Sequence, residues 1–197
     1  MGAVRKQKLG MKDIIVASVL GVICIAIRML FMLLGGLVPV MWFASHMLDA
    51  IFIGPIFMLV VAKTKRPGPV LIISLVTALV FLSASVYIPL TAVVFGLLAE
   101  LALYQGRYTR PVWLLLAYIC FSYSFLGDFL PLWIHKAAFL QSASQTMDAA
   151  YLAALSKLVS SQTLGLILIS ILIGALAGGL WGLKLMKKHF KKAGLAA

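Results

Sequence analysis

The sequence has few acidic residues and few charged residues of any kind. Among 197 residues there are 5 Asp and Glu against 17 Lys and Arg. A paired-carboxylate catalytic site or a carboxylate-rich metal site therefore has few possible ligands. Charged residues make up 11% of the chain and hydrophobic residues 63%, with a mean hydropathy of +1.11. Because a soluble domain of this length needs more polar residues to cover its surface, we expect lipid to surround most of the chain.

Several catalytic motifs are also missing. The sequence contains no Gly-x-x-x-x-Gly-Lys-Ser/Thr phosphate loop, no His-Glu-x-x-His and no Gly-x-Ser-x-Gly, so ATP hydrolysis through the first motif is excluded. The two cysteines, Cys24 and Cys120, each lie within an apolar run, where an isolated thiol is typical of a small core residue rather than a disulfide or a metal ligand. We predict no catalytic residues, no metal site and no bound cofactor.

What the sequence does have is long apolar runs, and a helix needs about 20 apolar residues to cross a bilayer. Six runs are candidates, the third being short: Asp13–Leu34, Met41–Ala62, Pro69–Ser83, Tyr87–Tyr104, Pro111–Trp133 and Gln162–Met186. The Ser83–Ser85 stretch before Pro89 indicates a turn between the third and the fourth. We predict an all-α protein, a six-helix membrane bundle in which residues 1–197 form a single domain.

The basic residues predict the orientation of this bundle. Most of the 17 lie in four groups: Arg5, Lys6, Lys8 and Lys12; Lys63, Lys65 and Arg66; Arg107 and Arg110; Lys184, Lys187, Lys188, Lys191 and Lys192. With six spans all four groups fall on one side, which the positive-inside rule assigns to the cytoplasm. Both termini are then cytoplasmic, and the first run is a retained span rather than a signal peptide. Clusters between apolar runs also argue against nucleic acid as the partner of this +12 chain.

The connection between the fifth and sixth runs, from about residue 135 to 161, is the one long loop of the predicted outer side. Met147, Tyr151, Leu155 and Leu158 recur there at helical spacing. We expect a short amphipathic helix on the outer surface, with Ser142–Gln145 as its capping box. It is either an interfacial helix without a further role or a lid over an outward-facing pocket.

Ionisable residues inside membrane spans are costly and are therefore site candidates. Arg28, His46, Asp49 and Asp128 come from three predicted spans, all in the outer half. If they meet, they form a polar pocket for a flat, partly polar metabolite. The alternative is an ion pair of Arg28 with Asp49 or Asp128 that only locks the bundle. The complete predicted substrate-binding set is Arg28, Trp42, His46, Asp49, Tyr87, Tyr123, Asp128, Trp133 and His135.

Small residues at four-residue spacing mark close helix contacts. In the last span, Gly174, Gly178 and Gly182 favour packing inside the bundle over a subunit contact. In the first span, Ala17 and Gly21 form a small-xxx-small pair in the cytoplasmic half, at a depth where a partner membrane subunit could contact the helix. Glu100, near the inner end of the fourth span, is expected to pair with a nearby basic residue.

Three segments resemble the Trep_Strep family of S components, the substrate-capturing subunits of energy-coupling factor (ECF) transporters. They are Gly54–Lys63, Leu130–Trp133 and Lys187–Gly194, and the likeness extends over nearly the whole length. The resemblance implies a protein of the prokaryotic plasma membrane that binds a micronutrient at its outer face. It also implies docking on a membrane scaffold (T) subunit driven by two cytoplasmic ATPases. In the superfamily of S components, the docking surface on the first helix carries an Ala-x-x-x-Ala pattern. Ala17 matches its first position, and Gly21 replaces the second alanine.

Neither the sequence nor the resemblance identifies the substrate. S components take vitamins, their precursors or metal ions, and His46, His135 and the aromatic residues keep heme among the candidates. Arg28 and Lys136 would equally suit a carboxylated ligand. Two other functions also remain: a self-contained small secondary transporter, although no inverted repeat is visible, and an integral membrane enzyme acting through Asp49 or Asp128.

Overall fold

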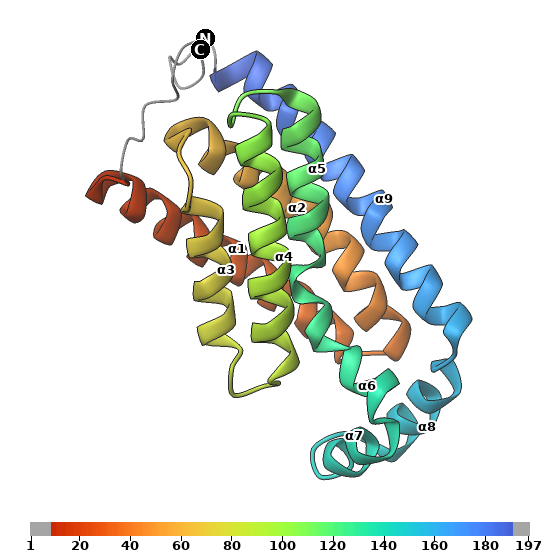
Figure 1. Ribbon diagram of the computed structural model, residues 1–197. Coiled ribbons are helices and arrows are strands. Elements are labelled where there is room, and N and C mark those ends of the chain that lie inside the picture. Colours follow the sequence, from red (N-terminus) through yellow and green to blue (C-terminus); the bar gives the residue numbers. More distant parts are fainter. Residues whose placement is uncertain (1–8, 191–197) are drawn as a thin grey trace.

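The computed structural model describes residues 9–190, which are almost entirely helical and contain no strand (Figure 1). The elements are α1 (Met11–Gly35), α2 (Pro39–Thr64), α3 (Pro69–Val80), α4 (Tyr87–Gln105), α5 (Pro111–Ser122), the 3₁₀ turn η1 (Tyr123–Asp128), α6 (Leu130–Ile134), α7 (Lys136–Ala143), α8 (Ala149–Leu158), α9 (Ser161–Leu185) and the π-helical turn η2 (Met186–Phe190). The predicted basic residues Arg5, Lys6, Lys8, Lys191 and Lys192 lie outside the described range.

Five helical segments of residues 9–190 are long and apolar enough to cross a membrane: α1, α2, α4, α5 continued through η1, and α9. Their outward faces expose large hydrophobic side chains such as Val19, Leu90 and Leu166, as lipid-facing helices do. This confirms the predicted all-helical membrane fold. The third run is shorter than predicted, because α3 has 12 residues and spans only about 18 Å. A sixth crossing by α3 stays a prediction.

The turns between helices gather at two ends of the bundle (Figure 1). The end where α9 finishes, which we call the basic end, holds two connections. One is the last turn of α2 with Lys63 and the α2–α3 connection with Lys65 and Arg66, and the other is the α4–α5 connection with Arg107 and Arg110. The α1–α2 turn, the α3–α4 turn and helices α6–α8 lie at the opposite end, which we call the cavity end. The alternation of charge in the sequence thus corresponds to two chemically different ends.

Helix α2 is the centre of the bundle and packs closely along α9. A Cβ added at Gly178 would lie 2.3 Å from the carbonyl oxygen of Ala50, and one at Gly54 would lie 2.2 Å from the backbone of Gly178. Gly174 and Gly182 face the α2 backbone in the same way. The predicted groove of small residues therefore serves packing inside the bundle, where only glycine permits this approach.

The small pair on α1 is also turned inward in this structure. Ala17 is fully buried, Gly21 is buried, and a Cβ at Gly21 would lie 3.4 Å from Cγ1 of Ile73 on α3. Helix α3 thus covers the surface that the sequence suggested for a partner subunit. The docking role of Ala17 and Gly21 itself stays a prediction.

Glu100 has a different partner from the basic side chain that we expected. Its Oε1 accepts hydrogen bonds from the backbone amides of Gly68 and Val70 at 3.0 and 2.9 Å, and its Oε2 accepts one from the Tyr108 hydroxyl at 3.0 Å. The carboxylate therefore caps the positive N-terminus of α3. Burial, followed by the negative charge of Glu100, raises the pKa of Tyr108 above its ordinary value, so the phenol remains a donor.

The long loop holds two helices instead of one. Helix α8 matches the predicted amphipathic segment, with Leu152 and Leu155 buried. The predicted capping box at residues 142–145 is wrong, because Ser142 belongs to α7 and the cap is Asp148, whose Oδ1 accepts from the amides of Ala150 and Tyr151 at 2.7 and 3.3 Å. An Asp immediately before the helix is a favourable N-cap, and the proline-free stretch of residues 136–143 forms a further helix.

Candidate functional site

Arg28 and Asp49 form a buried ion pair between α1 and α2. Nε and Nη2 of Arg28 each lie 3.0 Å from Oδ2 of Asp49, and the guanidinium carbon lies 4.5 Å from the ring centre of Phe125. The void beside the pair has a volume of about 10 Å³, which is room for about one water molecule. This pair is sealed inside the bundle, and its cation has both a carboxylate and an aromatic face as partners.

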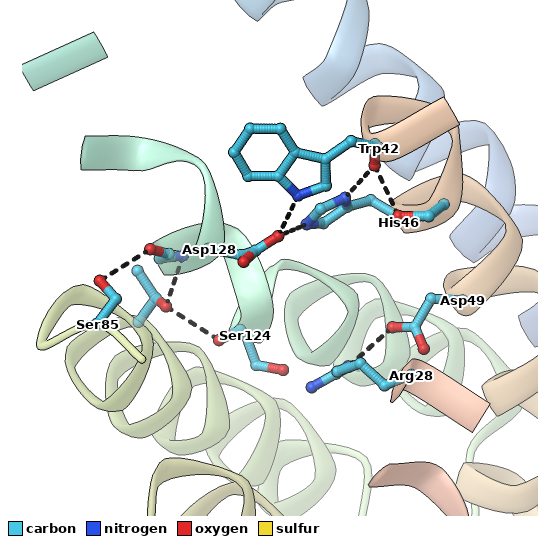
Figure 2. A network of polar contacts seen from close by, with 10 residues as sticks. Arg28, Trp42, His46, Asp49, Ser85, Ser124 and Asp128 are labelled. Atoms are coloured by element: carbon cyan, nitrogen blue, oxygen red, sulfur yellow. Dashed lines mark hydrogen bonds and ion pairs between the residues drawn. The ribbon is translucent and has the colours of Figure 1, made fainter. Parts of the chain in front are cut away.

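Trp42, His46 and Asp128 form a second polar cluster, between α2 and η1 (Figure 2). The indole Nε1 of Trp42 donates to Oδ2 of Asp128 at 2.6 Å. The Nδ1 of His46 lies 3.1 Å from the Trp42 carbonyl oxygen, so Nδ1 carries the proton of this bond. Its Nε2 lies 3.5 Å from the same Asp128 oxygen, which is long for a hydrogen bond and leaves an attraction that depends on the imidazole being positively charged.

The position of Asp128 follows from a break in the fifth predicted span. The chain leaves the α-helix at Tyr123 and continues to Asp128 as the 3₁₀ turn η1, which contains Gly127. The Thr91 hydroxyl accepts from the Gly127 amide at 3.0 Å and lies 3.0 Å from the carbonyl oxygen of Ser124 (Figure 2). A Cβ at Gly127 would lie 2.1 Å from the Tyr87 carbonyl oxygen, so glycine is required there.

A cavity of about 760 Å³ opens beside the second cluster, at the cavity end. One wall comes from the end of α1 and the α1–α2 turn, the other from the start of α8. Its apolar lining residues include Met32, Leu37, Val38, Pro39, Met147 and Ala154, and its polar ones are Trp42, Asp128, Thr146, Asp148 and Tyr151. The size and the apolar wall with a few polar groups are typical of a site for a small metabolite.

Tyr151 joins the two walls of this cavity. Its hydroxyl donates to the carbonyl oxygen of Gly35 at 2.9 Å, so helix α8 is fastened to the end of α1. Burial, followed by the negative charge of Asp128, raises the pKa of Tyr151, which keeps the hydroxyl protonated as this bond requires. Helix α8 thus forms one side of the cavity, held by this bond and by the buried Leu152 and Leu155.

Of the nine predicted binding residues, the structure brings four polar ones into two adjacent clusters and places Trp42 and Asp128 on the cavity. The others contact different parts. The Tyr123 hydroxyl donates to Leu168 O at 2.8 Å and Trp133 Nε1 to Ser160 O at 3.0 Å. The rings of Tyr87 and His135 lie 6.4 Å apart. None of these four lines the cavity, so an aromatic wall built from Tyr87, Tyr123 and Trp133 is absent from it.

The cavity also includes residues that were not in the predicted substrate-binding set. The α1–α2 turn from Gly35 to Pro39 and Tyr151 on α8 contribute much of its wall. Tyr151 could have been predicted from the sequence, since it lies on the apolar face of the predicted outer helix. Nothing in the sequence of the turn indicates a binding site, because Gly, Leu, Val and Pro are common in any connection between spans. Within residues 9–190, no group of three or more His, Cys, Asp and Glu side chains could hold a metal ion.

The fold and the apolar surface define an integral membrane protein that crosses the bilayer several times. Residues 11–192 match a family described as hypothetical bacterial integral membrane protein (Trep_Strep). The chain belongs to this family, as its sequence motifs indicated. A search of the curated proteins finds no match.

Among solved structures, the fold is similar to a crystal structure of an S-component of an ECF transporter, with a TM-score of 0.55 and 19% sequence identity. The similarity covers 95% of this chain and 89% of the other. At this identity the likeness concerns the arrangement of the helices.

Proposed function

We propose that the protein is the substrate-binding S component of an ECF-type uptake transporter. The observation that carries this proposal is the cavity of about 760 Å³ at the end of the bundle opposite the basic turns. Its wall holds a fixed carboxylate, that of Asp128, whose position depends on Trp42 and on the 3₁₀ turn. The family and the S-component fold support the same function.

In this proposal α3 is the sixth membrane crossing and both termini are cytoplasmic. The positive-inside rule then places the basic end in the cytoplasm and the cavity at the outer face. A small-molecule micronutrient enters from outside and is held between the α1–α2 turn and α8. Helix α8 acts as a lid, and the bond from Tyr151 to Gly35 is the contact that holds it shut.

The chain would deliver its substrate by docking on a membrane scaffold subunit with two cytoplasmic ATPases. The missing phosphate loop supports an external source of energy. We expect docking through the basic-end half of α1. Since α3 covers Ala17 and Gly21 here, a scaffold that contacts them must displace α3, and the remaining contacts would come from exposed neighbours such as Val19 and Val22.

Reconstitution in liposomes tests this function. The purified chain alone should bind its substrate without concentrating it, and uphill uptake should require the scaffold and the ATPases. Uphill uptake by the chain alone, driven by an ion gradient, would overturn the proposal and indicate a secondary transporter.

A substitution separates docking from binding. Gly21→Leu should abolish uptake by the complete transporter while the isolated chain keeps its substrate affinity. Leu30→Ile, a change of an exposed residue in the half of α1 farther from the basic end, is the control. Uptake that survives Gly21→Leu in full would remove Ala17 and Gly21 from the docking surface.

A further inference from the structure

Among the described residues, the charged side chains that line the cavity are all acidic, and their sign indicates which class of substrate the cavity favours. Within the described residues, the lining contains two carboxylates, Asp128 and Asp148, and no Lys, Arg or His. The basic side chains that might have paired with an anion are engaged elsewhere. Arg28 is bound to Asp49, and the Lys136 ammonium donates to the Ser156 carbonyl oxygen at 2.9 Å.

The Asp128 carboxylate has one oxygen left for a ligand. Both protein groups that face it, Trp42 Nε1 and His46 Nε2, approach Oδ2. No described residue donates to Oδ1, and both contacts in Figure 2 reach the other carboxylate oxygen. Asp128 lines the cavity, and its side chain is 11% exposed. Because a carboxylate in an apolar wall is costly unless it is paired, this oxygen favours a positively charged partner.

Two helices begin at this wall, α2 at Pro39 and α8 at Ala149, and helix N-termini can attract an anion through free amides. In α2, Pro39 has no amide proton. The amides of Met41 and Trp42 donate to the Val38 carbonyl oxygen at 3.0 and 3.4 Å.

In α8, two of the amides are occupied by a side chain of the protein itself. The Asp148 side chain accepts from the amides of Ala150 and Tyr151 at 2.7 and 3.3 Å. The protein thus supplies its own anion at this position, which removes the start of α8 as a site for a carboxylated ligand and places a second negative charge on the wall.

We infer that the cavity takes an organic cation, a metabolite with an apolar body and a protonated amine or cationic ring nitrogen that pairs with Oδ1 of Asp128. The inference rests on the proposed function and names the substrate class of the same cavity. It argues against a carboxylated ligand held by Arg28 or Lys136. It also argues against heme, whose two carboxylates would face Asp128 and for which neither His46 nor His135 lines the cavity.

Three probes of similar shape and different charge test the inference: phenethylamine, 2-phenylethanol and 3-phenylpropionate. Binding is measured by saturation-transfer NMR and calorimetry on the protein in phosphatidylcholine nanodiscs, with empty nanodiscs subtracted. The amine should bind at least about tenfold more tightly than either of the others, as expected for a hydrogen bond to a charged group. Equal binding of the three, tighter binding of the acid, or no binding of the amine at about 10 mM would overturn the inference.

Two variants and a control connect the preference to one carboxylate. Asp128→Asn keeps an acceptor for Trp42 and should abolish the preference for the amine, whereas Asp128→Glu should retain part of it. Asp13→Asn makes the same change at the basic end, where Asp13 pairs with Arg66 at 2.7 Å, and should leave the preference unchanged. A preference that persists in Asp128→Asn would contradict the assignment.

Mass spectrometry of small molecules released from the purified protein separates this inference from the proposed function. Release of a cationic metabolite, depleted in Asp128→Asn, supports both. Release of an anionic or neutral metabolite overturns the inference and leaves the S-component function in place. If no metabolite is released and no probe binds, both fail.

Discussion

Two polar clusters lie side by side in the same half of the bundle, and they differ in the space that adjoins them. The Arg28–Asp49 pair is sealed beside a void of about 10 Å³, whereas Trp42 and Asp128 border a cavity of about 760 Å³. Each cluster leaves one carboxylate oxygen without a protein donor, but Oδ1 of Asp49 is buried beside the small void, whereas the carboxylate of Asp128 lines the cavity. The comparison indicates that one cluster stabilises the helix arrangement and the other is available to a ligand.

Removing the cation of the sealed pair should have the largest effect on stability. Arg28→Met leaves Asp49 buried without its partner, and we expect a loss of about 3–5 kcal/mol in the free energy of unfolding. Denaturant titration in detergent micelles measures it. The double variant Arg28→Met, Asp49→Leu should recover much of the loss, because it removes both charges. A single variant of unchanged stability that binds its substrate weakly would reverse the roles of the two clusters.

An intermediate effect is expected from Trp42→Phe, which keeps an aromatic ring between Phe43 and Phe139 and removes the donor to Asp128. Loss of a hydrogen bond to a charged group should cost about 1.5–3 kcal/mol of stability. Substrate affinity should also fall, since Asp128 is no longer held in place. Calorimetry with the co-purified metabolite measures the affinity.

Trp133→Phe is the matched control for that variant. It removes an indole donor that bonds to Ser160 O, away from the cavity, while keeping an aromatic ring beside Phe43 and Phe129. The affinity should change by no more than about twofold. An equal fall in affinity for both variants would place Trp133 in the site after all, as its sequence position suggested.

The smallest effect should come from Tyr151→Phe. The variant loses only the bond to Gly35 O, which is worth about 0.5–1.5 kcal/mol. If α8 is a lid, the loss should appear as severalfold faster substrate dissociation with little change in the association rate. Stopped-flow fluorescence separates the two rates. Dissociation at the wild-type rate would leave α8 as an interfacial helix without a gating role.

The sequence predicted the elements that depend on local pattern. Apolar runs located the spans, basic residues predicted two unlike ends, and the rarity of intramembrane charge singled out Arg28, Asp49 and Asp128. Which carboxylate pairs with Arg28 was not predictable, because both lie at similar depth and the choice depends on helix rotation and packing. That packing follows from glycine contacts such as Gly54 against Gly178.

The cavity itself was beyond sequence reasoning for a related reason. Much of its wall is an apolar turn whose residues would look the same in any connection between helices, and the rest comes from α8, more than 100 residues later in the chain. The aromatic residues expected to form it make hydrogen bonds in other parts of the bundle. Tyr123 and Trp133 reach backbone carbonyl oxygens of α9 and of its N-cap, respectively, which satisfies their polar atoms.

The central claim is that this cavity holds the substrate, and native mass spectrometry of two neighbouring variants tests it most directly. Ala153 and Ala154 are both exposed on α8, but only Ala154 lines the cavity. Ala154→Trp should fill the cavity and abolish the bound metabolite, whereas Ala153→Trp should retain it. A metabolite that stays bound to Ala154→Trp at the wild-type level would contradict the claim.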